Sequence, residues 1–313
     1  MSFLSPEQAS HPIKGRTVTT LLLALGVAAC GAATGETVSF SPMGPPDTPG
    51  AVVPAAVPGT LSFPQNAAGR GPAVVIAHDS GGLTPEGPES DYVAALNAAG
   101  MATLVIDMWT PRHVPSGPAA IGGDGGGDRR PRSISDTLPD AFGALKLLAE
   151  RPAIDPRRIG IMGFSWGAML SFLAMSEPAA ERALGSDLRF AAHSGHYFVC
   201  SLFLPGAPMA SATAAKWTGA PLQLQVGGQD DYDSADGGAS CRRLVEDLPP
   251  DKRRQVELIV YPEAAHAWEL KLPRPISFDD PRTRRSVRVT PDAATSAQAR
   301  AATVVFFKNA LGS

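Results

Sequence analysis

Gly163-Phe164-Ser165-Trp166-Gly167 follows an apolar run at residues 158–162 and precedes a run of helix-forming residues at 168–175. A Gly-x-Ser-x-Gly sequence between a strand and a helix is typical of a sharp turn that exposes the serine hydroxyl as a nucleophile. Such a turn strains the backbone of the serine, and glycines on both sides prevent steric clashes there. Because chains rich in glycine and serine contain this pentapeptide by chance, its weight depends on the rest of the sequence.

The rest of the chain alternates predicted strands with predicted helices. Apolar runs that are typical of buried strands occur at residues 73–77, 102–106, 159–162, 189–192, 222–226 and 256–261. Helical patterns occur at residues 91–99, 140–151, 167–175 and 293–311. This alternation predicts an α/β fold, with a doubly wound, mostly parallel sheet in a single domain. Functional side chains are then expected at the carboxyl ends of the strands.

Two strand ends after Ser165 carry the groups that a serine nucleophile needs. A serine hydroxyl becomes reactive when a histidine takes its proton, and a carboxylate orients that histidine. Asp230 follows one predicted strand and His266 follows the next. We therefore predict a catalytic triad of Ser165, Asp230 and His266. Asp231 and Asp233, in the same loop as Asp230, are alternatives for the acid.

Two backbone N–H groups are expected to stabilise the negative charge that develops on the substrate carbonyl. Trp166 should provide one, because the turn directs the amide after the nucleophile into the site. Ser80 should provide the other, from the glycine-rich loop His78-Asp79-Ser80-Gly81-Gly82. Trp109 and Tyr232 lie on strand-end loops and are predicted to line the substrate pocket, although packing in the core would explain these aromatic residues equally well.

Together these segments resemble the serine-nucleophile branch of the dienelactone hydrolase family. The resemblance covers residue 59 to the C-terminus and rests on five stretches: His78-Asp79-Ser80-Gly81-Gly82, Asp107-Met108-Trp109-Thr110-Pro111-Arg112, Gly163-Phe164-Ser165-Trp166-Gly167, Gly227-Gly228-Gln229-Asp230-Asp231 and Tyr261-Pro262-Glu263-Ala264-Ala265-His266. It implies an α/β-hydrolase fold and the hydrolysis of esters or lactones without a metal or organic cofactor.

The resemblance also implies that Arg112 binds substrate, because it matches the first of two arginines that hold a carboxylate in the founding members. Leu270 stands in place of the second arginine, and Ser165 stands where the founding members have cysteine. We therefore expect a natural substrate other than a dienelactone.

Residues 1–29 are typical of a bacterial export signal. Lys14 and Arg16 precede an apolar run that is too short to span a bilayer but suits a signal peptide. The run ends in Val27-Ala28-Ala29-Cys30-Gly31, which resembles a lipobox, where a cysteine becomes the lipidated N-terminus. We predict lipidation at Cys30, with ordinary secretory cleavage nearby as the alternative. Either event places the protein outside the cytoplasm, and a lipid would be its link to the membrane.

Residues 41–58 are rich in proline, glycine and small residues, which is typical of a tether or an extended edge segment. We therefore predict a tether at residues 30–58, followed by the catalytic domain at residues 59–313. Once Cys30 is assigned to a lipid, Cys200 and Cys241 remain. An oxidising compartment favours a disulfide between them, and two buried free thiols are the alternative. The family resemblance favours the bond, because several relatives have cysteines near both positions.

The formal net charge of −3 gives no basic surface for nucleic acid. His193-x-x-His196 lies near a strand end without the additional ligands of a metal site, so we predict no metal. The sequence thus predicts an exported serine hydrolase that cleaves small-molecule esters or lactones through an acyl-enzyme on Ser165. A serine peptidase of the prolyl-oligopeptidase type and a non-catalytic binding protein with a hydrolase fold are the alternatives.

Overall fold

A mixed β-sheet forms the centre of the structure. The computed structural model describes residues 35–65, 69–117, 130–185, 187–280 and 284–312, which lie within one compact unit, Ala33–Ser313. The strands of the sheet are β1 (Glu36–Phe40), β2 (Val57–Ser62), β3 (Gly71–Ala77), β4 (Ala102–Ile106), β5 (Ile154–Phe164), β6 (Ala192–His196), β7 (Leu222–Gly227) and β8 (Val256–Tyr261). Within the described ranges, these eight strands pair in the order β1-β2-β4-β3-β5-β6-β7-β8. Strands β3 to β8 are parallel, and β2 is antiparallel to both of its neighbours.

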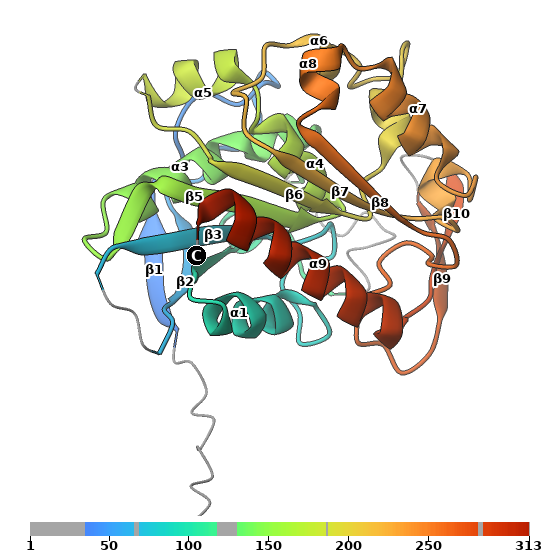
Figure 1. Cartoon of the computed structure of the whole chain (residues 1–313), viewed down its shortest axis with the longest axis horizontal. Helices are drawn as coiled ribbons and strands as arrows, with labels where there is room; N and C mark the ends of the chain where they lie inside the picture. Colours follow the sequence, from blue (N-terminus) through green and yellow to red (C-terminus); the bar gives the residue numbers. More distant parts are fainter. Residues whose placement is uncertain (1–34, 66–68, 118–129, 186, 281–283, 313) are drawn as a thin grey trace, which may run out of the picture. The chain divides into compact units, whose positions relative to one another are not determined.

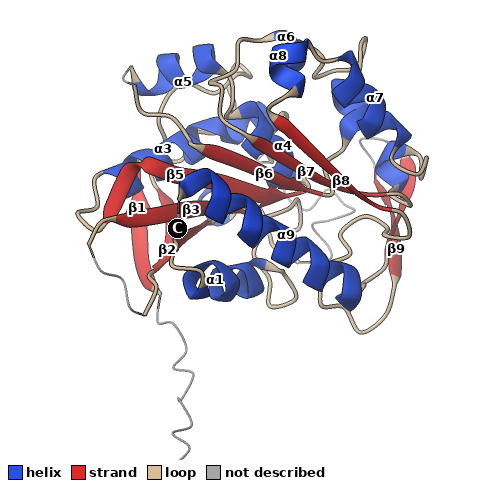
Figure 2. Cartoon of the chain, in the orientation of Figure 1, coloured by secondary structure: helices blue, strands red, loops and turns tan. Residues whose placement is uncertain are grey.

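Helices cover both faces of this sheet. The α-helices are α1 (Glu89–Ala98), α3 (Leu138–Ala149), α4 (Trp166–Leu173), α5 (Glu177–Leu184), α6 (Ser211–Ala214), α7 (Ala239–Asp247), α8 (Pro250–Arg253) and α9 (Ala293–Leu311). Single 3-10 turns are η1 (Thr110–Arg112), η3 (Ile134–Thr137), η4 (Cys200–Phe203) and η5 (Asp231–Asp233). Helices α1 and α9 pack on one face, and α3, α4, α5 and α7 pack on the other (Figure 1; Figure 2). The predicted doubly wound, mostly parallel fold in one domain is therefore confirmed.

The arrangement of β3 explains why its sequence is apolar throughout. Successive side chains of a strand point to opposite faces of the sheet. Val75 packs in the core beneath α3 and α4, whereas Val74 and Ile76 pack in the core beneath α1 and α9. Because both faces are covered, every residue from Ala73 to Ala77 is fully buried.

Helix α9 closes the second face and ends the described chain. The carboxylate of Asp292 accepts hydrogen bonds from the first free N–H groups of the helix, those of Ala294 and Thr295. Gly312 ends the helix in a left-handed conformation, with φ of 69°. In the portion of the chain that the structure describes, no helix is both long enough and apolar enough to cross a bilayer.

The sheet begins earlier than the sequence predicted. Residues 36–40 lie within the predicted tether at 30–58, but they form β1, which pairs with β2 from Glu36 opposite Leu61 to Phe40 opposite Val57. In this stretch the chain is an extended edge segment and not a tether, because β1 is at the edge of the described sheet and Val38 and Phe40 bury their side chains in the core. The predicted signal peptide and Cys30 lie outside the described residues.

The position of β6 is a second difference from the sequence analysis. The predicted strand at residues 189–192 is shifted in the structure to Ala192–His196. Its histidines face opposite sides of the sheet, where each ring has a buried partner: His193 Nδ1 lies 2.7 Å from the carbonyl of Ser171, and His196 Nδ1 lies 3.0 Å from Glu269. These contacts explain why polar residues occupy a buried strand. They also show that the two histidines cannot share a metal ion.

A separate hairpin of β9 (Ile276–Asp280) and β10 (Arg285–Val289) lies between β8 and α9 in the sequence. Nothing in the sequence analysis predicted it, because its strands are short and alternate exposed with buried positions. Val289 forms an isolated parallel bridge with His266. The hairpin therefore packs directly beside the predicted catalytic histidine.

Candidate active site

The turn between β5 and α4 holds Ser165 in a conformation that few residues adopt. Its φ is 48° and its ψ is −104°, and its N–H donates to the carbonyl of His196 at 2.9 Å. A Cβ at Gly163 would overlap the backbone of Gly167, and a Cβ at Gly167 would overlap the carbonyl of Ala77. Both glycines of the pentapeptide are thus required by the close approach of neighbouring backbone.

The three residues predicted as a triad lie together at the carboxyl ends of β5, β7 and β8. His266 Nε2 is 3.0 Å from Ser165 Oγ, and His266 Nδ1 is 2.7 Å from Asp230 Oδ2. All three side chains are buried. Because an ionised carboxylate can only accept, Nδ1–H donates to Asp230, which leaves Nε2 free to accept the serine proton.

Each aspartate of the loop after β7 has a different partner. Asp230 contacts His266, whereas Asp231 Oδ2 accepts a hydrogen bond from the N–H of Arg288 in β10. The Asp233 carboxylate accepts from the N–H groups of Cys200 and Ser201 at 2.9 and 2.8 Å. Burial raises the pKa of Asp233. Of the three candidates, the geometry therefore selects Asp230 as the partner of the histidine.

Cys200 and Cys241 form a disulfide, with Cα atoms 5.0 Å apart. The bond connects η4 to α7, and the Asp233 carboxylate lies 3.4 Å from the sulfur of Cys241. These three residues are close enough to share a metal, alone among the described histidines, cysteines and acids. Bonded sulfurs are not thiolate ligands, however, so we interpret the group as a brace for the loop that carries Asp230.

The loop after β3 is held in place by hydrogen bonds to buried side chains. The N–H of Met108 donates to His78 Nε2 at 3.0 Å, so the other ring nitrogen, Nδ1, carries the proton and donates to the carbonyl of Asp79 at 2.7 Å. Burial lowers the pKa of His78 to about 4, which keeps the ring neutral. Because N–H and C=O point in opposite directions across a trans peptide, the N–H of Ser80 points away from His78.

Trp109 supports this loop from behind. Its indole Nε1 donates to the carbonyl of Ser80 at 3.1 Å, and Arg130 donates to the same carbonyl at 2.6 Å. The Trp109 ring is fully buried and packs edge-on against His78 and Trp166. The prediction that Trp109 lines the substrate pocket is corrected: the indole positions the loop that carries Ser80.

The structure also corrects the prediction that Arg112 binds substrate. Its guanidinium donates to both carboxylate oxygens of Asp140, at 2.6 and 3.0 Å, and to the carbonyl of Met108 at 2.8 Å. The side chains of Arg112 and Asp140 are 1% and 0% exposed. The arginine is therefore committed to a buried ion pair and cannot reach a ligand.

Tyr232, predicted to line the substrate pocket, lies beside His266, the predicted catalytic histidine. Its ring centroid is 4.6 Å from that of His266, and its hydroxyl donates to Asp280 Oδ2 at 2.8 Å. Arg285 donates to the carbonyl of Tyr232. The hairpin of β9 and β10 thus holds Tyr232 through Asp280 and Arg285. No pattern in the sequence predicted these contacts.

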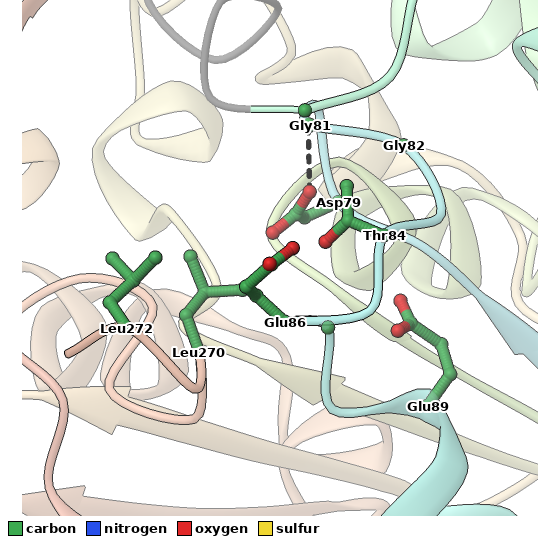
Figure 3. A pocket seen from close by; sticks show the side chains of 10 residues that line it. Asp79, Gly81, Gly82, Thr84, Glu86, Glu89, Leu270 and Leu272 are labelled. Carbon is green, nitrogen blue, oxygen red and sulfur yellow. Dashed lines mark hydrogen bonds between the residues drawn. The ribbon is translucent and has the colours of Figure 1, made fainter.

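A small pocket of about 20 Å³ opens beside the loop that carries Ser80. The carboxyl groups of Asp79, Glu86 and Glu89 surround it, and Leu270 and Leu272 form its apolar side (Figure 3). Burial raises the pKa of Asp79 to about 6 and that of Glu89 to about 8, and the charge of Asp79 adds to the shift at Glu89. The described lining of this pocket includes no basic side chain.

Comparisons with known proteins show the family of the chain and agree with its fold. The model of the dienelactone hydrolase family matches residues 57–311. A dienelactone hydrolase from Anabaena variabilis is 20% identical, with a TM-score of 0.56 over 90% of this chain and 99% of that one. Esterase 2 of Thermogutta terrifontis, in a form phosphoramylated by tabun, is 16% identical, with a TM-score of 0.56 over 89% and 95% of the two chains. An esterase from Pyrococcus furiosus is 15% identical, with a TM-score of 0.55 over 89% and 93%. None of the curated proteins shows significant similarity to the chain.

Proposed function

Because the chain belongs to the dienelactone hydrolase family, we propose that it cleaves carboxylic esters or lactones through an acyl-enzyme on Ser165. The observation that carries this proposal is the unbroken line of hydrogen bonds from Asp230 through His266 to Ser165. A protein that only binds ligands has no need of three buried polar side chains in this arrangement.

The reaction follows from the tautomer of His266. Nε2 takes the proton of Ser165 as the hydroxyl attacks the ester carbonyl, and Asp230 stabilises the imidazolium that forms. His266 then gives this proton to the leaving alcohol, which leaves an acyl group on Ser165. A water molecule, deprotonated by His266, attacks the acyl group and releases the acid and the free serine.

The negative charge on the carbonyl oxygen would be stabilised by the N–H groups of Trp166 and Ser80. The N-terminus of α4 supports this role for Trp166, because helix N-termini attract negative charge. The fixed Asp79–Ser80 peptide supports it for Ser80, because the donor is oriented before substrate binds.

We further propose that the substrate carries no carboxylate near the reacting carbonyl. The described lining of the pocket beside the Ser80 loop offers no basic side chain to pair with an anion, and Arg112 is engaged by Asp140. We expect 4-nitrophenyl butyrate to be hydrolysed with a kcat/KM at least about tenfold higher than the hemisuccinate ester with the same leaving group. Equal values for the two esters would refute this preference.

Export and lipidation at Cys30 belong to the same proposal. The apolar run before Cys30 and the disulfide between Cys200 and Cys241 support an oxidising compartment outside the cytoplasm. In a bacterial host, metabolic labelling with an alkyne-bearing palmitate should mark the full-length protein and leave Cys30→Ala unmarked. Labelling of both proteins would exclude Cys30 as the site.

The decisive test of the reaction is Ser165→Ala, compared with Ser171→Ala. Ser171 is a buried serine on α4 whose hydroxyl donates to the carbonyl of Ile161, so it controls for the loss of a buried hydroxyl. Ser165→Ala should lower kcat on 4-nitrophenyl butyrate by at least about 10⁴-fold and abolish labelling by a fluorophosphonate probe. Ser171→Ala should keep both, and the two melting temperatures show that each variant folds. Activity that survives in Ser165→Ala would overturn the mechanism.

A further inference from the structure

A second imidazole–carboxylate pair is buried behind the triad. His196 Nδ1 lies 3.0 Å from Glu269 Oε2, and the two side chains are 0% and 2% exposed. The hydroxyl of Tyr92 donates to the other oxygen of Glu269, and Thr303 Oγ1 lies 2.9 Å from His196 Nε2. No step of the proposed reaction uses these groups. A buried pair of this kind usually adds little stability over apolar residues of similar volume, so stability alone does not account for it.

The pair connects the two chain segments that meet at the reacting atoms. The backbone carbonyl of His196 accepts a hydrogen bond from the N–H of Ser165 at 2.9 Å. Glu269 lies three residues after His266, in the same loop. Ser165 and His266 are 101 residues apart in the sequence, so their relative position depends on contacts such as this one.

Residues with unusual backbone conformations lie near both ends of the contact between His196 and Glu269. Ser165, Tyr197 and Ala267 have φ values of 48°, 41° and 53°, which residues other than glycine rarely adopt. Tyr197 directly follows His196, and Ala267 directly follows His266. Strained residues of this kind persist only where the surrounding structure holds them. The contact between His196 and Glu269 joins the segments in which they occur.

We propose that Glu269 is a positioning residue, which holds His266 in reach of Ser165 through its contact with His196. This inference rests on the proposed esterase function. Without the carboxylate, the loop can relax at Ala267, and the imidazole moves away from the hydroxyl that it must deprotonate. Misplacement by about 1 Å at a reacting centre lowers the rate by about 10²-fold.

The test is Glu269→Gln, which keeps the shape of the side chain and removes its charge. With 4-nitrophenyl butyrate, kcat should fall by about 10- to 100-fold while KM changes by less than about twofold. Tyr261→Phe is the matched control: it removes a buried hydroxyl that donates to Gln225, a neighbour of His196, but does not contact Glu269. That control should lower the melting temperature and keep kcat.

A second variant separates positioning from general stability. Ala267→Gly makes the left-handed conformation at residue 267 intrinsically accessible. Added to Glu269→Gln, it should restore kcat at least about threefold, because the loop no longer needs the carboxylate to hold a strained residue. Should Glu269→Gln fail to fold, Tyr92→Phe tests the same carboxylate by removing the hydroxyl that donates to its other oxygen, with a several-fold loss of kcat expected.

A folded Glu269→Gln protein with the kcat of the wild type would overturn the inference. So would a loss no greater than that of Tyr261→Phe, or an unchanged kcat when Ala267→Gly is added. These outcomes differ from failure of the proposed function, in which the wild type itself hydrolyses no ester and Ser165 resists the fluorophosphonate probe.

Discussion

Replacing Arg112 by methionine should lower stability and leave substrate binding unchanged. The guanidinium makes two hydrogen bonds to Asp140 and further ones to the carbonyls of Met108 and Val52. Its removal leaves the Asp140 carboxylate fully buried without a counter-charge. Breaking a buried ion pair by removing one partner costs about 3–5 kcal/mol in free energy of unfolding. At about 2–4 °C per kcal/mol for a large domain, the melting temperature should fall by about 6–20 °C.

The assay combines thermal unfolding with kinetics on the neutral and anionic esters named above. Arg157→Met is the control, because that arginine is 88% exposed and its surface ion pair contributes little. The double variant Arg112→Met/Asp140→Leu should recover part of the lost stability, since it removes the unpaired carboxylate as well. The reasoning would be refuted if the melting temperature of Arg112→Met fell by less than about 2 °C and its KM for the anionic ester rose about tenfold. Arg112 would then be a substrate-binding residue.

Three further predictions follow from the same contacts. Asp230→Asn should lower kcat by about 10³- to 10⁴-fold through loss of the correct imidazole tautomer, whereas Asp231→Asn should stay within about twofold; similar losses in both would contradict the choice of acid. Replacing Cys200 and Cys241 together by alanine removes a cross-link over a separation of 41 residues, which should cost about 4 kcal/mol in urea unfolding, and an unchanged midpoint would count against the bond. Burial raises the pKa of Glu89 to about 8, so between about pH 5 and pH 8 the native state keeps a proton that the unfolded chain has already lost, and the free energy of unfolding should fall as pH rises. Glu89→Gln should flatten this decline, and a decline of equal slope in both proteins across that range would disprove the prediction.

The hairpin of β9 and β10 shows how much of this site comes from outside the sheet. Its residues take no part in the proposed chemistry, yet Arg288 holds Asp231, Asp280 holds Tyr232 and Val289 bridges to His266. Short strands with exposed alternate positions carry little sequence signal, because neither their length nor their apolar content differs from that of a loop.

The sequence alone determined the backbone plan of the site. Apolar runs predicted β3 and β4, because strands that are buried on both faces tolerate few polar residues. Strands β7 and β8 were also predicted, although β7 contains two glutamines and most of β8 is only half-buried. The glycines around Ser165 predicted the turn, because backbone packs where their side chains would be. Ser165, the aspartates of the loop after β7, and His266 follow strands that the sequence predicted, and parallel strands end at the same edge of a sheet. The sequence therefore predicted that these three segments meet, but it left open which aspartate contacts the histidine.

Only the tertiary structure decided which partner each polar side chain takes. Arg112 and Asp140 are 28 residues apart, and His196 and Glu269 are 73 residues apart, so no local pattern links them. Asp230 and its neighbours are chemically identical until the positions of His266 and β10 assign them different partners. A local pattern is set by backbone geometry and the burial of a few adjacent residues. A buried hydrogen bond depends on where distant segments pack, and that is settled when the whole core forms.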